Sequence, residues 1–515
     1  MVNTTGPDGQ PAARPVATPP RPRTIITTDP ELDDLNSMIR LVLYSNELAI
    51  EGLIYASSRY HWKGDGEGTE FFLPDREYDR PQSSWRWAKG ERFIDDVLDA
   101  YAQVHRNLVV HDPRYPAPED LRAVVREGNV SFEGDISEES PGSRLIEETL
   151  LDDRTGPVHL QVWAGTSTIA RALLSIEERY RGTPHRERVR AEVSEKAVIT
   201  KFDSQDATYD DYIRSHWPDI RVVDVATWAW GYFARRLALP EYAQMLRAEW
   251  MREHVTSIGP LGRLYRTWGD GRRMVDGDIM DFFHLSGYSA DELRAMGFNV
   301  WTDVQAPGEW ISEGDTTNML NLFANGLRGH EHPSYGGWGG RAVPTADGPD
   351  EWSVKGAQDH PLDTESEVYE YGVTRWFADA QRDFAGRLRW SVTPAFEQAR
   401  HHPTVTVAPG VDLGAVPGQS LVLTATVTDP DGGTVSCRWW HYREAGTFPG
   451  QVELTDADTP VVTARIPGEA APGQTLHLIL EACNDAVLPL KVYQRVIVTI
   501  DAGAEAPVRP ADVTA

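Results

Sequence analysis

The first part of the chain shows a pattern of apolar residues that changes period within a short distance. Residues 24–28 form an apolar, β-branched run, and residues 35–43 carry apolar side chains at three- and four-residue spacing. A second apolar run covers residues 49–57. A strand, a helix and a strand within about 35 residues predict a βαβ unit and therefore a parallel sheet.

The same alternation returns further along the chain. A helix is predicted to begin at Ser167, and a shorter one to cover residues 209–215. Runs rich in β-branched residues predict three more strands, at residues 158–163, 197–202 and 219–225. Together these segments predict an α/β domain with a mostly parallel sheet.

The C-terminal part has a different pattern, with short alternating strands and a turn signal about every ten residues. Asp429-Pro-Asp-Gly-Gly433 is a tight turn between two of these strands. This spacing predicts an immunoglobulin-like β-sandwich of about 100 residues. Residues 402–418, which contain Pro and Gly, are expected to form a linker that merges into a first strand. The clearest predicted strands are residues 421–428, 435–442, 461–466, 476–482 and 493–500.

The length of 515 residues predicts at least two domains. We expect a disordered, Pro-rich leader at residues 1–22, an α/β domain at 23–400, a sandwich at 401–503 and a disordered tail at 504–515. Two long stretches, residues 60–85 and 329–363, are rich in Gly, Pro and aromatic residues, which is typical of functional loops.

The net charge of −28 argues against nucleic acids and anionic membranes as partners. No apolar run is long enough to span a bilayer, and the leader lacks the apolar core of a signal peptide. The cytoplasm is therefore the default location. A secreted or periplasmic location stays open in case an export segment was removed, and so does assembly into a homo-oligomer.

Two residue types add to this picture. Cys437 and Cys483 leave a single disulfide open, although two buried thiols are the simpler interpretation. The 17 tryptophans are individually best explained as core residues. Their number nevertheless favours a sugar-stacking surface, because an indole offers a flat apolar face.

The main candidate for chemistry is the acidic turn Asp29-Pro-Glu-Leu-Asp-Asp34, which follows the first predicted strand. In open α/β sheets, ligands bind at the carboxyl ends of the strands. An acidic cap with Pro at the start of a helix is an alternative explanation. However, crowded carboxylates repel by about 1 kcal/mol per pair in water, and a hard divalent cation such as calcium removes that repulsion.

The stretch ITTDPELDD resembles the DxDPGxDD signature of the inosine-uridine nucleoside hydrolases. The resemblance implies that Asp29 is a calcium (Ca²⁺) ligand and general base, that Asp34 is a second ligand, and that Asp33 holds sugar hydroxyls. Thr27 and Glu31 depart from the signature, where the family has Asp and Gly.

Two further segments are similar to the same family. Residues 163–170 (WAGTSTIA) resemble its GPLTNIA turn, which implies a calcium-binding carbonyl at Ser167. In residues 313–316 (EGDT), Asp315 matches the last calcium ligand. Gly314 replaces a histidine that helps a nucleobase depart in the family, so purine and pyrimidine leaving groups are disfavoured.

A closer resemblance covers residues 23–500. The motifs HPSYGGWGGR, DFAGRLRW, RWWHYREAGT and YQRVIVTI resemble a bacterial family often labelled "cellulose-binding protein". Its members join a nucleoside-hydrolase-like domain to an Ig-like domain. The resemblance therefore implies an open, mostly parallel sheet with helices on both faces, followed by an all-β sandwich.

Other residues are weaker candidates. Gln205 and Asp206 would face the same sheet edge and contact a sugar, or else form a turn or cap. Trp338 and Arg341 lie in a Gly-rich loop that would bind substrate, or else form a structured loop without a ligand. The pair His330 and His332 is a weak zinc signal. In the sandwich, Arg443 and Glu444 are expected to dock on the α/β domain, with a salt bridge between the two as the alternative.

From these residues we expect calcium-dependent hydrolysis of a glycosidic bond in a carbohydrate or other glycoside. Asp29 would take a proton from water in a single displacement that inverts the anomeric centre. No residue is assigned as the general acid. Two alternatives stay open: a non-catalytic protein that binds cellulose or a plant glycan, and a ribonucleoside hydrolase.

Overall fold

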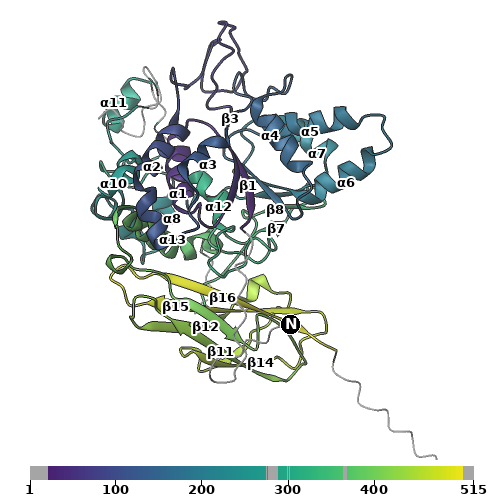
Figure 1. Ribbon diagram of the computed structural model, residues 1–515, viewed down its shortest axis with the longest axis vertical. Coiled ribbons are helices and arrows are strands. Elements are labelled where there is room, and N and C mark those ends of the chain that lie inside the picture. The colour runs from purple at the N-terminus through teal and green to yellow at the C-terminus, as the bar shows by residue number, and fades with distance from the viewer. Residues whose placement is uncertain are drawn as a thin grey trace, which may run out of the picture.

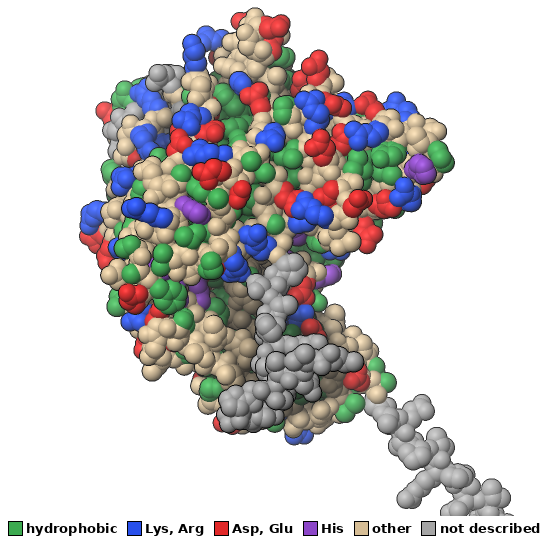
Figure 2. Space-filling model, in the orientation of Figure 1, with side chains coloured by type: hydrophobic (Ala, Val, Ile, Leu, Met, Phe, Trp, Pro, Cys, Tyr) green, Lys and Arg blue, Asp and Glu red, His purple; other side chains and the backbone are tan. Residues whose placement is uncertain are grey.

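The computed structural model describes residues 21–273, 275, 288–297, 300, 302–362 and 368–502. Figure 1 shows a larger α/β domain packed against a smaller β-sandwich. The predicted leader and tail lie almost wholly outside the described residues. No helix in the described ranges has the length and apolarity needed to cross a membrane. On the face drawn in Figure 2, acidic and basic side chains are interspersed over the larger domain.

The α/β domain is built on an eight-stranded sheet in the order β3-β2-β1-β4-β5-β6-β8-β7. Every neighbouring pair is parallel except β7 and β8, so the predicted parallel sheet is confirmed. The strands are β1 (Arg23–Thr28), β2 (Ala49–Tyr55), β3 (Val125–Glu127), β4 (Val158–Val162), β5 (Ala197–Lys201), β6 (Arg221–Asp224), β7 (Val343–Pro344) and β8 (Glu351–Ser353).

Helices cover both faces of this sheet, as Figure 1 shows. Because side chains alternate across a strand, Ile25 packs into the cluster formed with α4, α5 and α6, whereas Ile26 packs into the cluster formed with α1, α2 and α13. The α-helices are α1 (Leu32–Leu43), α2 (Phe93–His111), α3 (Pro118–Ala123), α4 (Pro141–Leu150), α5 (Ser167–Tyr180), α6 (Arg186–Lys196), α7 (Arg214–His216), α8 (Ala234–Leu237), α9 (Ala248–Met251), α10 (Gly259–Leu264), α11 (Ala290–Ala295), α12 (Thr317–Leu320) and α13 (Tyr371–Val392).

Short 3₁₀ and π turns link these helices. The predicted helix at residues 209–215 is a π-helix, η1 (Tyr209–Ile213), continued by α7. The others are η2 (Ala243–Leu246), η3 (Arg252–Thr256), η4 (Gly314–Thr316), η5 (Phe396–Gln398) and η6 (Arg443–Ala445).

The C-terminal domain is a sandwich of two four-stranded sheets, ordered β10-β16-β15-β12 and β13-β14-β11-β9. Residues 402–418 were expected to be a linker that merges into a first strand; they contain two strands that pair with the sheets, so the linker is shorter than expected. Cys437 and Cys483 are both free thiols. The strands are β9 (Thr404–Ala408), β10 (Asp412–Ala415), β11 (Ser420–Thr428), β12 (Val435–His441), β13 (Glu453–Thr455), β14 (Val461–Arg465), β15 (Thr475–Asn484) and β16 (Lys491–Ile500).

The two domains share a packed interface. Asp379 on α13 accepts hydrogen bonds from Tyr493 Oη (2.6 Å) and forms an ion pair with Lys491 Nζ (2.8 Å), both on β16. Glu444 confirms the predicted docking, since its carboxylate lies 3.3 Å from His360 of the α/β domain, and it also forms the alternative salt bridge with Arg443 (3.4 Å). Trp440 and Tyr493 of the sandwich belong to the same buried cluster as α1 and α13. The interface is therefore part of the hydrophobic core.

Candidate active site

The acidic turn lies where β1 gives way to α1, at the carboxyl edge of the parallel sheet. Asp29 follows the strand directly, Glu31 precedes the first residue of α1, and Asp33 and Asp34 lie in the first helical turn. Asp29, Asp33 and Asp34 are buried. Glu31 does not cap the helix through its side chain, so capping alone does not explain this group of carboxylates.

A distant segment, the 3₁₀ turn η4, brings a further carboxylate to this place. Asp33 Oδ2 accepts hydrogen bonds from Ser312 Oγ (2.8 Å) and from the amide of Gly314 (3.3 Å), which is 281 residues further along the chain. The next residue, Asp315, is buried, and among the charged neighbours of Asp34 it has the largest effect on that carboxyl. The structure therefore brings Asp29, Asp33, Asp34 and Asp315 together.

These carboxyl groups are crowded together away from solvent. Burial raises the pKa of Asp34 and of Asp315 well above the usual range, and the charges of the neighbouring carboxylates raise both further. Burial also raises the pKa of Asp33. Asp29 Oδ2 and Asp315 Oδ1 are buried oxygens without a hydrogen-bond partner. Buried polar atoms are normally paired, so two unpaired carboxylate oxygens in one cluster point to a bound cation or ligand.

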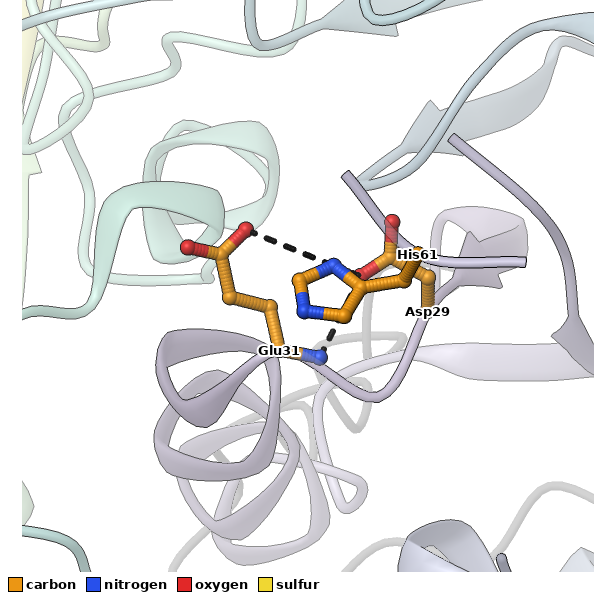
Figure 3. Close-up of side chains that lie close together, drawn as sticks. All are labelled: Asp29, Glu31 and His61. Atoms are coloured by element: carbon orange, nitrogen blue, oxygen red, sulfur yellow. Dashed lines mark hydrogen bonds and ion pairs between the residues drawn. The ribbon is translucent and has the colours of Figure 1, made fainter. Parts of the chain in front are cut away.

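The sequence analysis missed His61, which lies in the loop after β2. Figure 3 shows its ring between Asp29 and Glu31. His61 Nδ1 lies 3.2 Å from Asp29 Oδ1 and 4.0 Å from Glu31 Oε2. Burial opposes the charged imidazolium, but the negative charges of Asp29 and Glu31 outweigh it, and the pKa of His61 is raised. The available signal was its position after a strand of the same sheet edge, although nothing local distinguishes it from other loop histidines.

Glu31, which was treated as a departure from the family signature, is part of the site as well. Tyr232 Oη donates a hydrogen bond of 2.8 Å to Glu31 Oε1. Burial, followed by the negative charge of Asp33, raises the pKa of Glu31 to about 8. The larger side chain at this position therefore links the acidic turn to the loop that carries Tyr232.

The donor set fits a hard divalent cation. Ligand atoms of Glu31, Asp33 and Asp34 lie within 4.8 Å of one another, and so do those of Asp29, Glu31 and His61. Calcium takes six to eight oxygen ligands in flexible geometry, and carboxylates are its preferred side-chain ligands. Within the described ranges, no group of three or more such ligands occurs outside this site, and His330 and His332 are not part of one.

Ser167 has other contacts than those expected. It is the first residue of α5, at the carboxyl end of β4, and its amide donates to Asp206 Oδ2 (3.0 Å). Across the part of the chain that the structure describes, no hydrogen bond joins Ser167 to Asp29 or to Asp315. Its role as a carbonyl ligand therefore stays a prediction.

Gln205 and Asp206 serve the same local structure. Asp206 is buried and accepts hydrogen bonds from the Ser167 amide, from Thr166 Oγ1 (3.1 Å) and from Thr208 Oγ1 (2.7 Å). Gln205 Nε2 donates to the Trp163 carbonyl (2.8 Å). The structure therefore favours the cap at the start of α5 over a sugar contact for Asp206.

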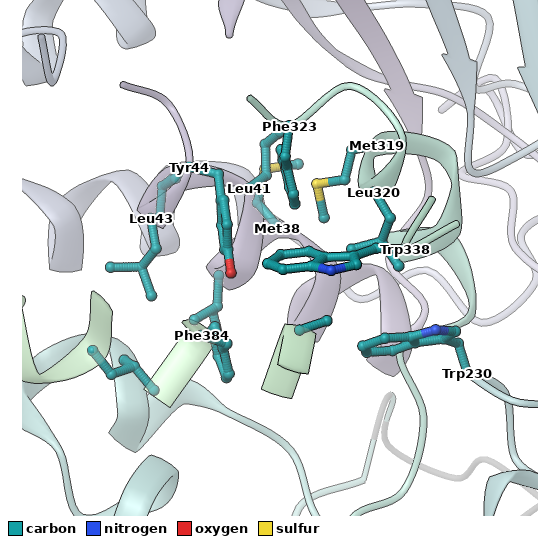
Figure 4. Close-up of a cluster of buried hydrophobic side chains, with 14 of the residues drawn as sticks. Met38, Leu41, Leu43, Tyr44, Trp230, Met319, Leu320, Phe323, Trp338 and Phe384 are labelled. Carbon is teal, nitrogen blue, oxygen red and sulfur yellow. The ribbon is translucent and has the colours of Figure 1, made fainter. Parts of the chain in front are cut away.

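The placement of Trp338 and Arg341 corrects their prediction as substrate-binding residues. Figure 4 shows Trp338 inside a cluster of buried apolar side chains, and its exposed fraction is 1%. Its indole N–H lies 3.4 Å from Tyr493 Oη of the sandwich. Arg341 forms an ion pair with Asp359 (2.8 Å), which also accepts from Tyr442 Oη of the sandwich. The Gly-rich loop binds the second domain, which excludes these side chains from solvent.

Comparisons with known proteins agree with this architecture. The family model described as cellulose-binding Sde182, nucleoside hydrolase-like domain, matches residues 23–342. The model of the C-terminal domain of cellulose-binding protein Sde0182 matches residues 420–500. No curated protein matches the chain.

Among solved structures, one from Saccharophagus degradans is similar over 94% of this chain and 100% of its own, with a TM-score of 0.68 and 22% sequence identity. It is described as a nucleoside hydrolase-related hypothetical protein that is associated with carbohydrate metabolism. This likeness bears on the fold. A mouse cadherin-23 fragment matches 19% of this chain and 32% of its own, with 21% identity and a TM-score of only 0.15.

Proposed function

Because the chain belongs to the cellulose-binding Sde182 family with its nucleoside hydrolase-like domain, we propose that it is a calcium-dependent hydrolase of a glycosidic bond in a carbohydrate or other glycoside. One observation carries the proposal. Buried carboxylates from two distant segments converge at the carboxyl edge of a parallel sheet, and two of their oxygens have no partner.

By the family pattern, Asp29, Asp34 and Asp315 are the residues that would hold the cation, and the Asp315 charge acts on the Asp34 carboxyl. When bound there, calcium supplies Lewis-acid polarisation of a water molecule and of sugar hydroxyls. The Ser167 carbonyl remains a proposed ligand on the family pattern alone.

The surroundings of Asp29 support a role as general base. Its Oδ1 accepts a hydrogen bond from the Glu31 amide (3.2 Å) and faces His61. Its Oδ2 is unpaired and can take a proton from water. Asp33 is held by Ser312 and Gly314, so a sugar hydroxyl would meet a carboxylate of fixed orientation. A single displacement by water predicts inversion at the anomeric carbon.

The test is release of product from aryl glycosides and plant oligosaccharides in the presence of calcium. We expect Asp29→Asn to lower turnover by at least about a hundredfold, the range for loss of a positioned base. Asp153→Asn is the matched control, because Asp153 is exposed on the loop that precedes β4, at the opposite edge of the sheet. Equal turnover by both variants and the wild type would rule out Asp29 as the base.

A non-catalytic carbohydrate-binding protein is the second candidate, and the family description favours it as much as the enzyme. Glycan binding without product release, in the wild type and in Asp29→Asn alike, would support this candidate and reject the enzyme. Hydrolysis of inosine and uridine tests the third candidate, a ribonucleoside hydrolase. Gly314 in place of a histidine predicts little activity on either nucleoside.

A further inference from the structure

The loop between β6 and α8 carries an unusually exposed tryptophan. Trp228 has an exposed fraction of 51%, whereas every other tryptophan in the described ranges is buried or half-buried. An exposed indole keeps a large apolar surface in water, which folding alone would disfavour by about 25 cal/mol for each Å². Because β6 runs parallel to β1, its carboxyl end opens at the same edge of the sheet as the acidic turn.

The loop is connected to the candidate active site at two points. The Trp230 carbonyl accepts a hydrogen bond of 2.8 Å from the amide of Glu313, the residue that precedes η4. Tyr232 Oη donates to Glu31 in the acidic turn. Trp228 is two residues from Trp230, so their Cα atoms are at most about 7 Å apart. Trp228 therefore belongs to the same short loop as the two residues that contact the site.

The loop is also held in one conformation. The carboxylate of Glu370, just before α13, accepts hydrogen bonds from the amides of Trp228 (3.1 Å) and Ala229 (2.9 Å) and from Thr227 Oγ1. The Trp228 ring meets Phe233 edge to face, with centroids 4.8 Å apart at 90°. An aromatic side chain fixed in this way loses little conformational entropy when a ligand stacks on it.

A second exposed aromatic residue lies beside the same anchor. Tyr369 directly precedes Glu370 and has an exposed fraction of 63%. Because Glu370 accepts hydrogen bonds from the Trp228 loop, the backbone of Tyr369 lies close to that loop. Exposed aromatic rings on these two segments offer flat apolar surface with polar edges, which suits saccharides.

We propose that Trp228, assisted by Tyr369, is the stacking subsite that holds a pyranose ring next to the acidic cluster. This inference rests on the proposed function and specifies where its substrate binds. The family description names cellulose, a β-1,4-linked glucan, and the equatorially substituted pyranoses of such a chain present apolar C–H faces on which an indole stacks. A neutral ligand also avoids the repulsion that the acidic turn would exert on an anionic sugar.

The test compares Trp228→Ala, Trp228→Phe and Tyr369→Ala with the wild type, all with calcium present. Binding of β-1,4-linked gluco-oligosaccharides of two to six units is measured by titration calorimetry. We expect Trp228→Ala to weaken binding of the longer oligosaccharides by roughly tenfold, with a smaller loss in Trp228→Phe. Val487→Ala, an exposed apolar truncation on the sandwich, serves as control and should bind like the wild type.

Two further measurements distinguish a loss of binding from a loss of folding. The far-UV spectrum and melting temperature of Trp228→Ala should match the wild type, because the ring is half in solvent. In protein labelled with 5-fluorotryptophan, the resonance that disappears in Trp228→Phe should move when the oligosaccharide binds. Affinities within twofold of the wild type in Trp228→Ala, or no binding of any oligosaccharide to the wild type, would overturn the subsite.

The two proposals fail in different ways. If the wild type binds the oligosaccharides through Trp228 but releases no product, the subsite stands and the hydrolase does not. If aryl glycosides are hydrolysed in an Asp29-dependent manner while Trp228→Ala changes neither binding nor turnover of any oligosaccharide, the hydrolase stands and the subsite falls. Binding of a protein at Trp228 instead of any saccharide would also overturn the proposed subsite.

Discussion

His61 Nδ1 lies 3.2 Å from Asp29 Oδ1, and both side chains are wholly buried at the carboxyl edge of the sheet. The imidazole is thus in direct contact with the carboxylate that is proposed as the general base. A charged imidazolium offsets part of the negative charge of the acidic turn, while Asp29 keeps its second oxygen unpaired.

Replacing His61 tests this contact. We expect His61→Gln to lower turnover of an aryl glycoside by about ten- to a hundredfold, because Asp29 would lose the partner that fixes its orientation. The measurement is steady-state kinetics at saturating calcium, with His105→Gln on α2 as the control. Unchanged kcat in His61→Gln would mean that the pair has no catalytic role.

Calcium should stabilise the wild type through the acidic cluster. At a hundredfold excess over its Kd, a ligand that binds only the folded state adds about 2.7 kcal/mol of stability. We expect the melting temperature to rise by several degrees with calcium, and Asp315→Asn to lose most of that rise. Differential scanning fluorimetry across a calcium series measures both, and Asp153→Asn should respond like the wild type. An equal calcium response in Asp315→Asn would remove Asp315 from the ligand set.

The raised pKa of Glu31 predicts a pH dependence in the presence of a chelator. The pKa of the Glu31 carboxyl is about 8 in the folded state and about 4.5 in the unfolded state. Between pH 4.5 and pH 8, the folded state therefore binds more protons than the unfolded state. Its contribution to stability is complete below pH 4.5 and is lost as the pH rises to 8. Urea denaturation at pH 6, 7 and 8 should show a shallower loss in Glu31→Gln than in the wild type, by at most about 1.4 kcal/mol per pH unit. Parallel slopes would contradict the shift.

Arg495 is expected to stabilise the contact between the two domains. Its buried guanidinium donates to the carbonyls of Leu327 (2.6 Å), Tyr335 (2.8 Å) and Gly336 (2.9 Å) in the α/β domain. Arg495→Met leaves these acceptors without a donor, and we expect a loss of about 3 kcal/mol or more. Calorimetry should show one transition in the wild type and an earlier or divided one in the variant. An unchanged single transition would show that the contact adds no stability.

Local sequence patterns predicted those helices and strands that pack against elements adjacent to them in the sequence. The βαβ unit formed by β1, α1 and β2 is an example, because Ile25 and Ile26 alternate in a fully buried strand. Helix α13 was not predicted. Its buried side includes Arg387, whose charge is matched by Glu47 and by Asp383. Buried charged residues of this kind interrupt the regular spacing of apolar residues that identifies a helix. Their burial can be explained only once their distant ion-pair partners are known.

The candidate site shows the same limit. The acidic turn could be recognised because its residues are contiguous, and Asp315 because it matches a family motif. His61 and Tyr232 reach the turn through loops whose course depends on the whole sheet. Trp338 was misassigned because a Gly-rich aromatic loop has the same composition whether it faces a ligand or another domain.

Gly326 lies where the α/β domain contacts the sandwich closely through its backbone. Its φ of +91° and the Tyr493 carbonyl, which a Cβ would meet at 1.8 Å, leave no room for a side chain. The segment that follows Asp315 and α12 is therefore held against β16, whose Tyr493 and Arg495 amides donate hydrogen bonds to the carbonyls of Asn325 and Gly326. A version of the chain trimmed to its first domain would lose this contact and expose the backbone that follows Asp315 to water.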